Sequence, residues 1–166
     1  MADPPPAPAR ARLLAGRRLY LCTADRPDLP AFLTACLRGG VDVVQLRDKE
    51  LDARPLLARA AVALAVCRAF GVPFILNDRP DLALACGADG VHVGQDDTPP
   101  EVARRVLGPD AIIGLSTHAP AEWDGAAPAE WDGAAPAGEA VDYLSAGPVN
   151  ATPTKPGRPG TGLGYL

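Results

Sequence analysis

The chain alternates between two kinds of hydrophobic pattern. Short runs rich in β-branched and aromatic residues recur, and most are separated by Ala- and Leu-rich stretches whose apolar residues repeat with a helical period. The runs cover residues 19–23, 41–46, 73–76, 90–93, 111–115 and 143–146. Strands that alternate with helices form parallel sheets, so the pattern predicts an α/β fold with six parallel strands.

The clearest helix is predicted between the second and third runs. Asp52 and Pro55 are typical of a helix start, and Gly71 is typical of a helix end. The apolar stripe between them comprises Leu57, Ala60, Ala61, Leu64 and either Cys67 or Arg68.

The chain contains two kinds of repeat. Three strands are entered through similar tripeptides, Gly40-Val41-Asp42, Gly87-Ala88-Asp89 and Ala140-Val141-Asp142, a weak repeat of a βα unit. The octapeptide PAEWDGAA occurs twice in tandem, over residues 120–135. Such identity is more economically a recent duplication than a structural motif. Because Gly and Pro recur in it, we expect a short helix and a solvent-facing insertion rather than one helix.

Composition then narrows the class of protein. A chain of 166 residues has the length of one domain, and 48% hydrophobic with 22% charged residues excludes disordered and fibrous classes. The net charge of −4 argues against nucleic acid or an anionic membrane as a partner held by bulk positive charge. No apolar run approaches the roughly 18 residues of a membrane span.

The amino-terminal segment differs from the rest. Residues 1–16 are Pro-rich and then basic, without an apolar stretch long enough for a secretory signal, so we expect a disordered tail followed by one folded domain over residues 17–166. The four cysteines occur singly, without a Cys-x-x-Cys pair or a neighbouring histidine. This is typical of buried free thiols in a reducing compartment, and we expect a cytoplasmic protein.

Polar residues gather directly after the predicted strands, where parallel sheets bind ligands. Alternation places Gln45, Arg47 and Lys49 on one face after the second strand, although an ordinary charged loop would have the same pattern. Asp78 follows the third strand, and Asp96 and Asp97 follow the fourth. Two converging carboxylates with open positions suit Mg²⁺, and for Asp96 we expect instead a cap on the next helix.

The last two strands lead into further polar residues. Ser116 and His118 share a face after the fifth strand, but the absence of a Gly-x-Ser-x-Gly elbow favours hydroxyl donation to a phosphate over nucleophilic catalysis. His92, within the fourth strand, is expected to be a hydrogen-bonded core residue. Thr152, Thr154 and Lys155 follow the sixth strand in a loop suited to anion binding, or to no function.

Lysine usage supports a phosphate site. Of the 16 basic residues only Lys49 and Lys155 are lysine, and both lie in these clusters. A compact ammonium is not replaceable by a guanidinium at a tight phosphate site, which would account for the two exceptions.

These clusters together resemble the thiamine phosphate synthase family. Five motifs occur in the family's order, over roughly residues 18–166. They are Gln45-Leu46-Arg47-Asp48-Lys49, Asn77-Asp78-Arg79, the segments 90–97 and 114–118, and Gly147-Pro148-Val149 with Thr152-Pro153-Thr154-Lys155.

The resemblance implies a (β/α)₈ TIM barrel and a transferase reaction. The family joins 4-amino-2-methyl-5-hydroxymethylpyrimidine diphosphate to hydroxyethylthiazole phosphate and releases thiamine phosphate and pyrophosphate. It implies that the pyrimidine's carbon–oxygen bond breaks first and that the thiazole nitrogen attacks the resulting cation. No protein nucleophile is then required.

The resemblance also implies a role for each motif residue. Gln45, Arg47 and Lys49 would contact the pyrimidine substrate and its diphosphate, with Asn77 beside them. The other implied roles are Mg²⁺ binding by Asp78 and Asp97, diphosphate or pyrimidine binding by Ser116 and Lys155, and thiazole phosphate binding by Thr152 and Thr154. Arg47, Lys49, Ser116 and Lys155 would form the catalytic set.

The length departs from the family pattern. A barrel of this type needs about 200 residues or more, so only about six of eight βα units are expected here, as in a truncated chain. The two missing βα units could be supplied by a second copy of the chain in a homo-oligomer or by a separate chain, or they could be absent altogether. Three readings remain open: a thiamine phosphate synthase, the related thiazole tautomerase, and an inactive fragment that only binds a phosphorylated ligand.

Overall fold

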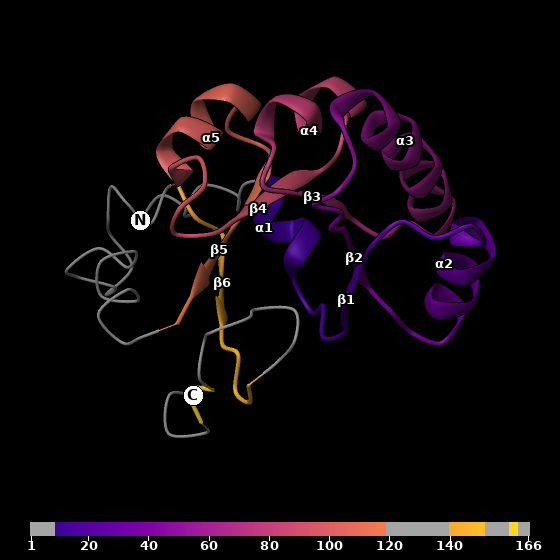
Figure 1. Ribbon diagram of the computed structural model, residues 1–166, viewed down its shortest axis with the longest axis horizontal. Helices are drawn as coiled ribbons and strands as arrows, with labels where there is room; N and C mark the ends of the chain where they lie inside the picture. Colours follow the sequence, from indigo (N-terminus) through magenta and orange to yellow (C-terminus); the bar gives the residue numbers. More distant parts are fainter. Residues whose placement is uncertain (1–8, 119–139, 152–159, 163–166) are drawn as a thin grey trace, which may run out of the picture.

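The six predicted strands form one parallel sheet. The computed structural model describes residues 9–118, 140–151 and 160–162 (Figure 1). Its strands pair in chain order, β1 to β6, each with the next. The elements are α1 (Ala9–Leu14), β1 (Tyr20–Thr23), α2 (Leu29–Arg38), β2 (Val43–Leu46), α3 (Ala53–Phe70), β3 (Phe74–Asn77), α4 (Pro80–Cys86), β4 (Gly90–Val93), α5 (Pro100–Leu107), β5 (Ile112–Thr117) and β6 (Tyr143–Ala146).

Helix α3 confirms the predicted boundaries and corrects the predicted face. Asp52 lies at its N-cap, and Gly71 ends it with φ 64°, a left-handed conformation that favours glycine. The buried residues of α3 include Leu56 and Ala63, where the sequence pattern placed Leu57 and Ala61. Leu57 is half-buried and Ala61 is exposed, whereas Ala60, Leu64 and Cys67 are buried as predicted, because the buried stripe is centred on Ala60, Ala63, Leu64 and Cys67.

The two faces of the sheet have different surroundings. Helices α2 to α5 cover the outer face (Figure 1), where side chains such as Leu46, Leu76 and Val91 are fully buried in the main core. On the inner face, Val43 and Ile75 form a smaller apolar cluster near the amino ends of the strands. Inward positions nearer the carboxyl ends are polar, so this half of the inner face is available for a site.

Helix α1 closes the amino end of the inner face. Its Leu13 and Leu14 pack against the inner apolar cluster. The sequence predicts disorder over residues 1–16, and this does not hold for Ala9–Leu14, because burial of the two leucines stabilises a short helix. Residues 1–8 lie outside the described part.

The weak tripeptide repeat has a structural explanation. Its aspartates accept backbone N–H bonds from the start of the neighbouring strand. Asp42 accepts from Arg18 and Leu19, at 2.7 and 2.8 Å. The corresponding bonds are Phe74 N to Asp89 and Ile113 N to Asp142, both 2.8 Å. Each aspartate thereby satisfies a backbone donor that the sheet would leave unpaired.

Asp142 also carries the most buried ion pairs among the described residues, and its neutralisation should destabilise the fold. Arg10 Nε and Arg104 Nη2 lie 2.6 and 2.7 Å from its carboxylate oxygens, and the side chains are only 10–17% exposed. Asp142→Asn leaves two cations without a counter-charge, so we expect the free energy of unfolding to fall by about 3 kcal/mol in urea titration. Asp81→Asn is the matched control, because its pair with Arg79 is exposed and should contribute under about 1 kcal/mol. Equal losses would contradict the prediction.

The sheet is curled into a half-barrel. Tyr20 of β1 and Tyr143 of β6 belong to strands at opposite ends of the sheet order, yet their hydroxyl oxygens lie 2.8 Å apart. Only a strongly curved sheet brings these inward side chains together. Among the described helices, none has the length and apolar character needed to span a bilayer.

Candidate active site

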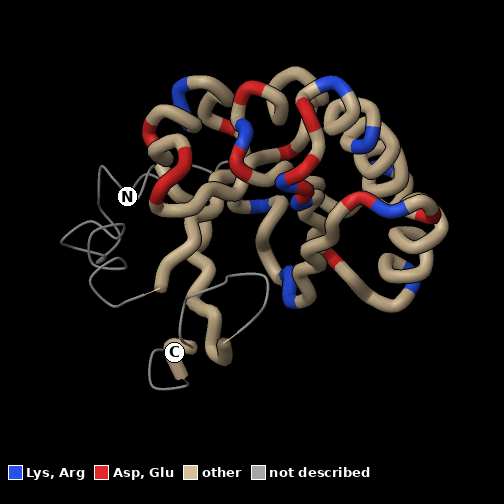
Figure 2. The backbone as a smooth tube through the Cα atoms, viewed as in Figure 1, with Lys and Arg blue, Asp and Glu red and all other residues tan. Residues whose placement is uncertain are grey.

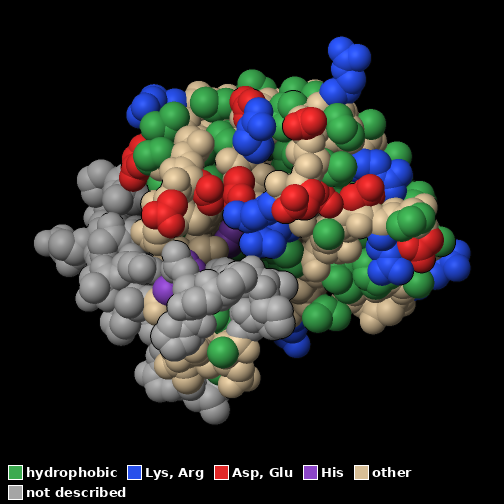
Figure 3. Space-filling view, viewed as in Figure 1, with side chains coloured by type: hydrophobic (Ala, Val, Ile, Leu, Met, Phe, Trp, Pro, Cys, Tyr) green, Lys and Arg blue, Asp and Glu red, His purple; other side chains and the backbone are tan. Residues whose placement is uncertain are grey.

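A cleft of about 920 Å³ opens at the carboxyl ends of the strands. Charged positions of both signs lie close together in the loops there (Figure 2), and on the surface they border a hollow in which histidine side chains are visible (Figure 3). The residues predicted from the motifs that line the cleft are Gln45, Arg47, Lys49, Asn77, Asp78, Asp97 and Ser116. They come from the ends of β2, β3, β4 and β5, so the expectation that these strand ends converge is confirmed.

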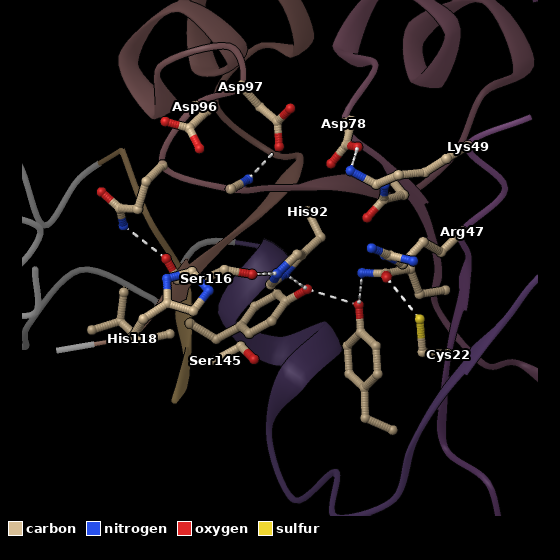
Figure 4. Close-up of a pocket in the computed structure, with 17 residues that line it drawn as sticks. Cys22, Arg47, Lys49, Asp78, His92, Asp96, Asp97, Ser116, His118 and Ser145 are labelled. Atoms are coloured by element: carbon tan, nitrogen blue, oxygen red, sulfur yellow. Dashed lines mark hydrogen bonds and ion pairs between the residues drawn. The ribbon is translucent and has the colours of Figure 1, made fainter. Parts of the chain in front are cut away.

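Two carboxylates and one ammonium meet at the upper rim of the cleft (Figure 4). Lys49 Nζ lies 3.1 Å from Asp78 Oδ2, and Asp97 is near enough to Asp78 to raise its pKa. Burial raises the pKa of Asp78 above its ordinary value, Asp97 raises it further, and Lys49 opposes both effects. The rim therefore holds two carboxylates that one proton or one further cation would stabilise.

The backbone holds both carboxylates in place. Asp78 has φ 60°, in the left-handed region, which turns the chain sharply at the end of β3. Asp97 Oδ2 accepts a 2.7 Å bond from the Gly94 N–H. The expected cap by Asp96 is wrong, because Pro99 occupies the N-cap of α5.

This donor set fits Mg²⁺. Within the described residues no three His, Cys, Asp or Glu side chains gather into a metal-binding group. Two carboxylates with open positions match a cation that keeps several waters and takes phosphate oxygens as its other ligands. Asp78 and Asp97 are the residues that would hold it.

His92 lies at the centre of the inner face. It is 8% exposed, and its Nε2 and Nδ1 atoms lie 2.8 Å from Ser116 Oγ and 2.9 Å from Tyr143 OH. The expectation of a hydrogen-bonded, buried histidine is confirmed, but His92 also lines the cleft, so it belongs to the site as well as to the core.

Sequence reasoning missed several cleft residues. Tyr20, Cys22, Tyr143, Leu144 and Ser145 also line the cleft. Gln45 Nε2 donates to Tyr20 OH at 2.9 Å, and Cys22 Sγ donates to Gln45 Oε1 at 3.0 Å. Burial raises the pKa of the two tyrosine hydroxyls and of the Cys22 thiol. The register pairs Cys22 with Gln45, so alternation from Gln45 across the strand pair would have identified Cys22 and Tyr20.

Gly114 makes room for this arrangement, and a methyl group there should disrupt it. A Cβ at Gly114 would lie 2.1 Å from the Tyr143 ring and 2.5 Å from His92 Nδ1. We expect Gly114→Ala to lower the free energy of unfolding by about 1–3 kcal/mol, because the buried His92 ring and the partly buried Tyr143 ring must shift. Chemical denaturation measures the loss, and stability equal to that of the unsubstituted chain would contradict this packing.

Some predictions lie outside the described residues. These are the loop residues Thr152, Thr154 and Lys155 and the tandem duplication over 120–135.

Comparison with known proteins identifies the family. The sequence model described as thiamine monophosphate synthase matches residues 19–166, which is most of the chain. The chain belongs to the thiamine monophosphate synthase family. A thiamine-phosphate synthase of Thermus thermophilus is 52% identical over 154 residues, which cover 90% of this chain and 69% of that protein. A thiamine-phosphate synthase of Thermobifida fusca is also 52% identical, over 90% of this chain and 66% of that protein.

A solved structure agrees with this membership. A thiamine phosphate pyrophosphorylase from Pyrococcus furiosus matches with a TM-score of 0.66 and 31% identity, over 80% of this chain and 60% of that one. The chain thus spans about two thirds of the length of these thiamine monophosphate synthase relatives. The family named from the motifs is confirmed.

Proposed function

We propose that the protein is a thiamine-phosphate synthase that joins a pyrimidine diphosphate to a thiazole phosphate and releases pyrophosphate. The observation that carries the proposal is the pairing of Asp78 with Asp97 beside Lys49 at the rim of the cleft, in a member of this family. A carboxylate pair that needs a cation, next to side chains that bind phosphate, suits a reaction in which diphosphate leaves.

The positively charged residues would stabilise the leaving group. Arg47 and Lys49 line the cleft from the end of β2, and their charges would offset the negative charge that gathers on pyrophosphate as the carbon–oxygen bond breaks. Mg²⁺, when bound, would supply further neutralisation of that charge as a Lewis acid. Asp78 and Asp97 would hold it.

Uncharged side chains would orient the pyrimidine. Gln45 and Asn77 are buried inward residues of adjacent strands, and Ser116 presents a hydroxyl at the opposite side of the cleft. We assign Thr152 and Thr154 to the thiazole phosphate and Lys155 to the diphosphate, from the motif resemblance. No side chain then needs to act as a nucleophile, because the thiazole nitrogen attacks the carbon cation directly.

The proposal extends to fold and location. The curled sheet would correspond to six of the eight units of a (β/α)₈ barrel, since the inward Tyr20 and Tyr143 meet across its interior. The expectation of four buried thiols is wrong, since only Cys67 is buried and Cys22 is exposed, but all four cysteines are free thiols, which supports a cytoplasmic location. The related thiazole tautomerase lacks the full set of residues that bind diphosphate and metal. The carboxylate pair in this cleft therefore favours the synthase over the tautomerase.

The direct test is synthesis by the purified chain. We expect thiamine phosphate, detected by mass spectrometry, when the chain is incubated with both substrates and Mg²⁺, and none when EDTA is added or either substrate is omitted. A folded chain that binds the pyrimidine diphosphate without forming product would contradict the proposal and support a binding function alone.

A further inference from the structure

A continuous chain of hydrogen bonds crosses the inner face of the sheet (Figure 4). Five bonds link side chains from five of the six strands, with donor–acceptor distances of 2.8–3.0 Å. In order, the members are Cys22, Gln45, Tyr20, Tyr143, His92 and Ser116. This series of hydrogen bonds ends at Ser116, which is half-buried and lines the cleft.

Which group donates in each of these hydrogen bonds is set at the Cys22 end of the series. Gln45 turns its amide oxygen to the Cys22 thiol and its amide nitrogen to the Tyr20 hydroxyl. A thiol is a weak donor and a still poorer acceptor, so the S–H bond to the amide oxygen favours this orientation over the flipped one. Tyr20 therefore receives a hydrogen from Gln45.

The hydroxyl groups of Tyr20 and Tyr143 each accept one hydrogen bond and donate the next one. Among the described residues, the Tyr20 hydroxyl bonds only Gln45 and Tyr143, so its hydrogen goes to the Tyr143 oxygen. Tyr143 then gives its own hydrogen to His92 Nδ1. Burial raises the pKa of both tyrosines, so both hydroxyls keep their hydrogens at neutral pH. With Nδ1 as an acceptor, the hydrogen of the neutral imidazole is on Nε2 and is donated to Ser116 Oγ.

We propose that Tyr143 is a positioning residue that holds His92 as its Nε2–H tautomer, so that Ser116 donates its own hydrogen to an anionic oxygen in the cleft. The identity of that oxygen, on the diphosphate, rests on the proposed function. The tautomer does not rest on it.

The reverse direction would present the wrong group to an anion. It would require Ser116 to donate to His92 and Gln45 to donate to the thiol sulfur. Ser116 would then turn lone pairs toward the phosphate oxygens, which repel them. The proposed direction uses each hydroxyl hydrogen and makes Ser116 a donor without any movement when the ligand binds.

The test reads the tautomer directly, without substrates. The chain has two histidines, so ¹⁵N NMR of the histidine-labelled protein, assigned with a His118→Asn variant, gives His92 alone. We expect the neutral Nε2–H form. Tyr143→Phe removes the partner of Nδ1 and should give mixed tautomers. Tyr20→Phe is the matched control, because it removes a hydroxyl from the same chain that does not touch His92, and it should keep the Nε2–H form.

A binding measurement tests the consequence. With pyrophosphate and Mg²⁺ as the probe in calorimetry, we expect Ser116→Ala and Tyr143→Phe each to weaken affinity roughly threefold to tenfold, the value of one hydrogen bond. An Nδ1–H or doubly protonated His92 in the unsubstituted protein would overturn the inference, even if thiamine phosphate is formed. The Nε2–H form together with the affinity losses supports it, even in a chain that makes no product.

Discussion

Asp97→Asn is expected to lower the Mg²⁺-dependent rate of thiamine phosphate formation by at least about 100-fold. The substitution keeps the shape of the side chain but removes one of two negative charges that would hold the cation. Its amide can still occupy the position beside Gly94, whose N–H bonds Asp97 at 2.7 Å, so the local backbone should survive. The loss should appear in the initial rate and in the Mg²⁺ concentration needed for half-maximal rate.

The pH dependence separates a metal ligand from a protonation effect. Asp97 raises the pKa of Asp78, so removing its charge lowers that pKa and leaves Asp78 ionised at neutral pH. A higher pH should therefore not restore the rate of Asp97→Asn. Asp110→Asn is the control, an exposed aspartate at the amino end of β5, and should have the rate of the unsubstituted chain. An Asp97→Asn rate within a few fold of that value would refute the metal assignment.

Lys49→Ala is expected to lower kcat/KM by about 100-fold, because it removes a cation that would bear on the departing diphosphate. Lys49 is half exposed and lies 3.1 Å from Asp78, so it could contact both the carboxylate pair and a bound diphosphate. Lys49→Arg should not restore the rate, since a planar guanidinium cannot replace a compact ammonium between a carboxylate and a phosphate.

The pH profile of Lys49→Ala should move in a definite direction. Lys49 lowers the pKa of Asp78, so its removal raises that pKa, and Asp78 takes up a proton at a higher pH than before. The acidic limb of the rate profile should shift to higher pH, and raising the pH should recover part of the loss, unlike in Asp97→Asn. Arg105→Ala, an exposed cation on α5, is the control. An unshifted acidic limb would show that Lys49 does not act on Asp78.

Patterns local to one element could be predicted well from the sequence. All six strands lie within two residues of their predicted bounds, because short β-branched runs between helical stretches have few alternatives. Gly71 ends α3 as expected, since its left-handed φ favours glycine. The motif residues after β2, β3, β4 and β5 share one cleft, because parallel strands direct their carboxyl ends to one edge.

Properties that depend on neighbours from distant parts of the chain could not be predicted. The helicity of Ala9–Leu14 depends on Val43 and Ile75 beneath it, and those contacts are invisible in a Pro- and Arg-rich tail. The roles of Tyr20 and Tyr143 depend on the curvature of the sheet, which brings together hydroxyls 123 positions apart in sequence. Likewise, the expected cap by Asp96 was wrong because the N-cap of α5 is Pro99, three residues later in the chain.

The sequence by itself determined the order of strands and helices, the family and the set of charged side chains at the strand ends. Periodicity, turn residues and short motifs are local properties, and the chain carries them before it folds. Only the tertiary structure decided that Lys49 lowers the pKa of Asp78 while Asp97 raises it. It also decided that His92 links Ser116 to Tyr143 and, through Tyr143, to Tyr20. These depend on distances of about 3 Å between side chains from different strands, which only the curvature and packing of the folded sheet establish.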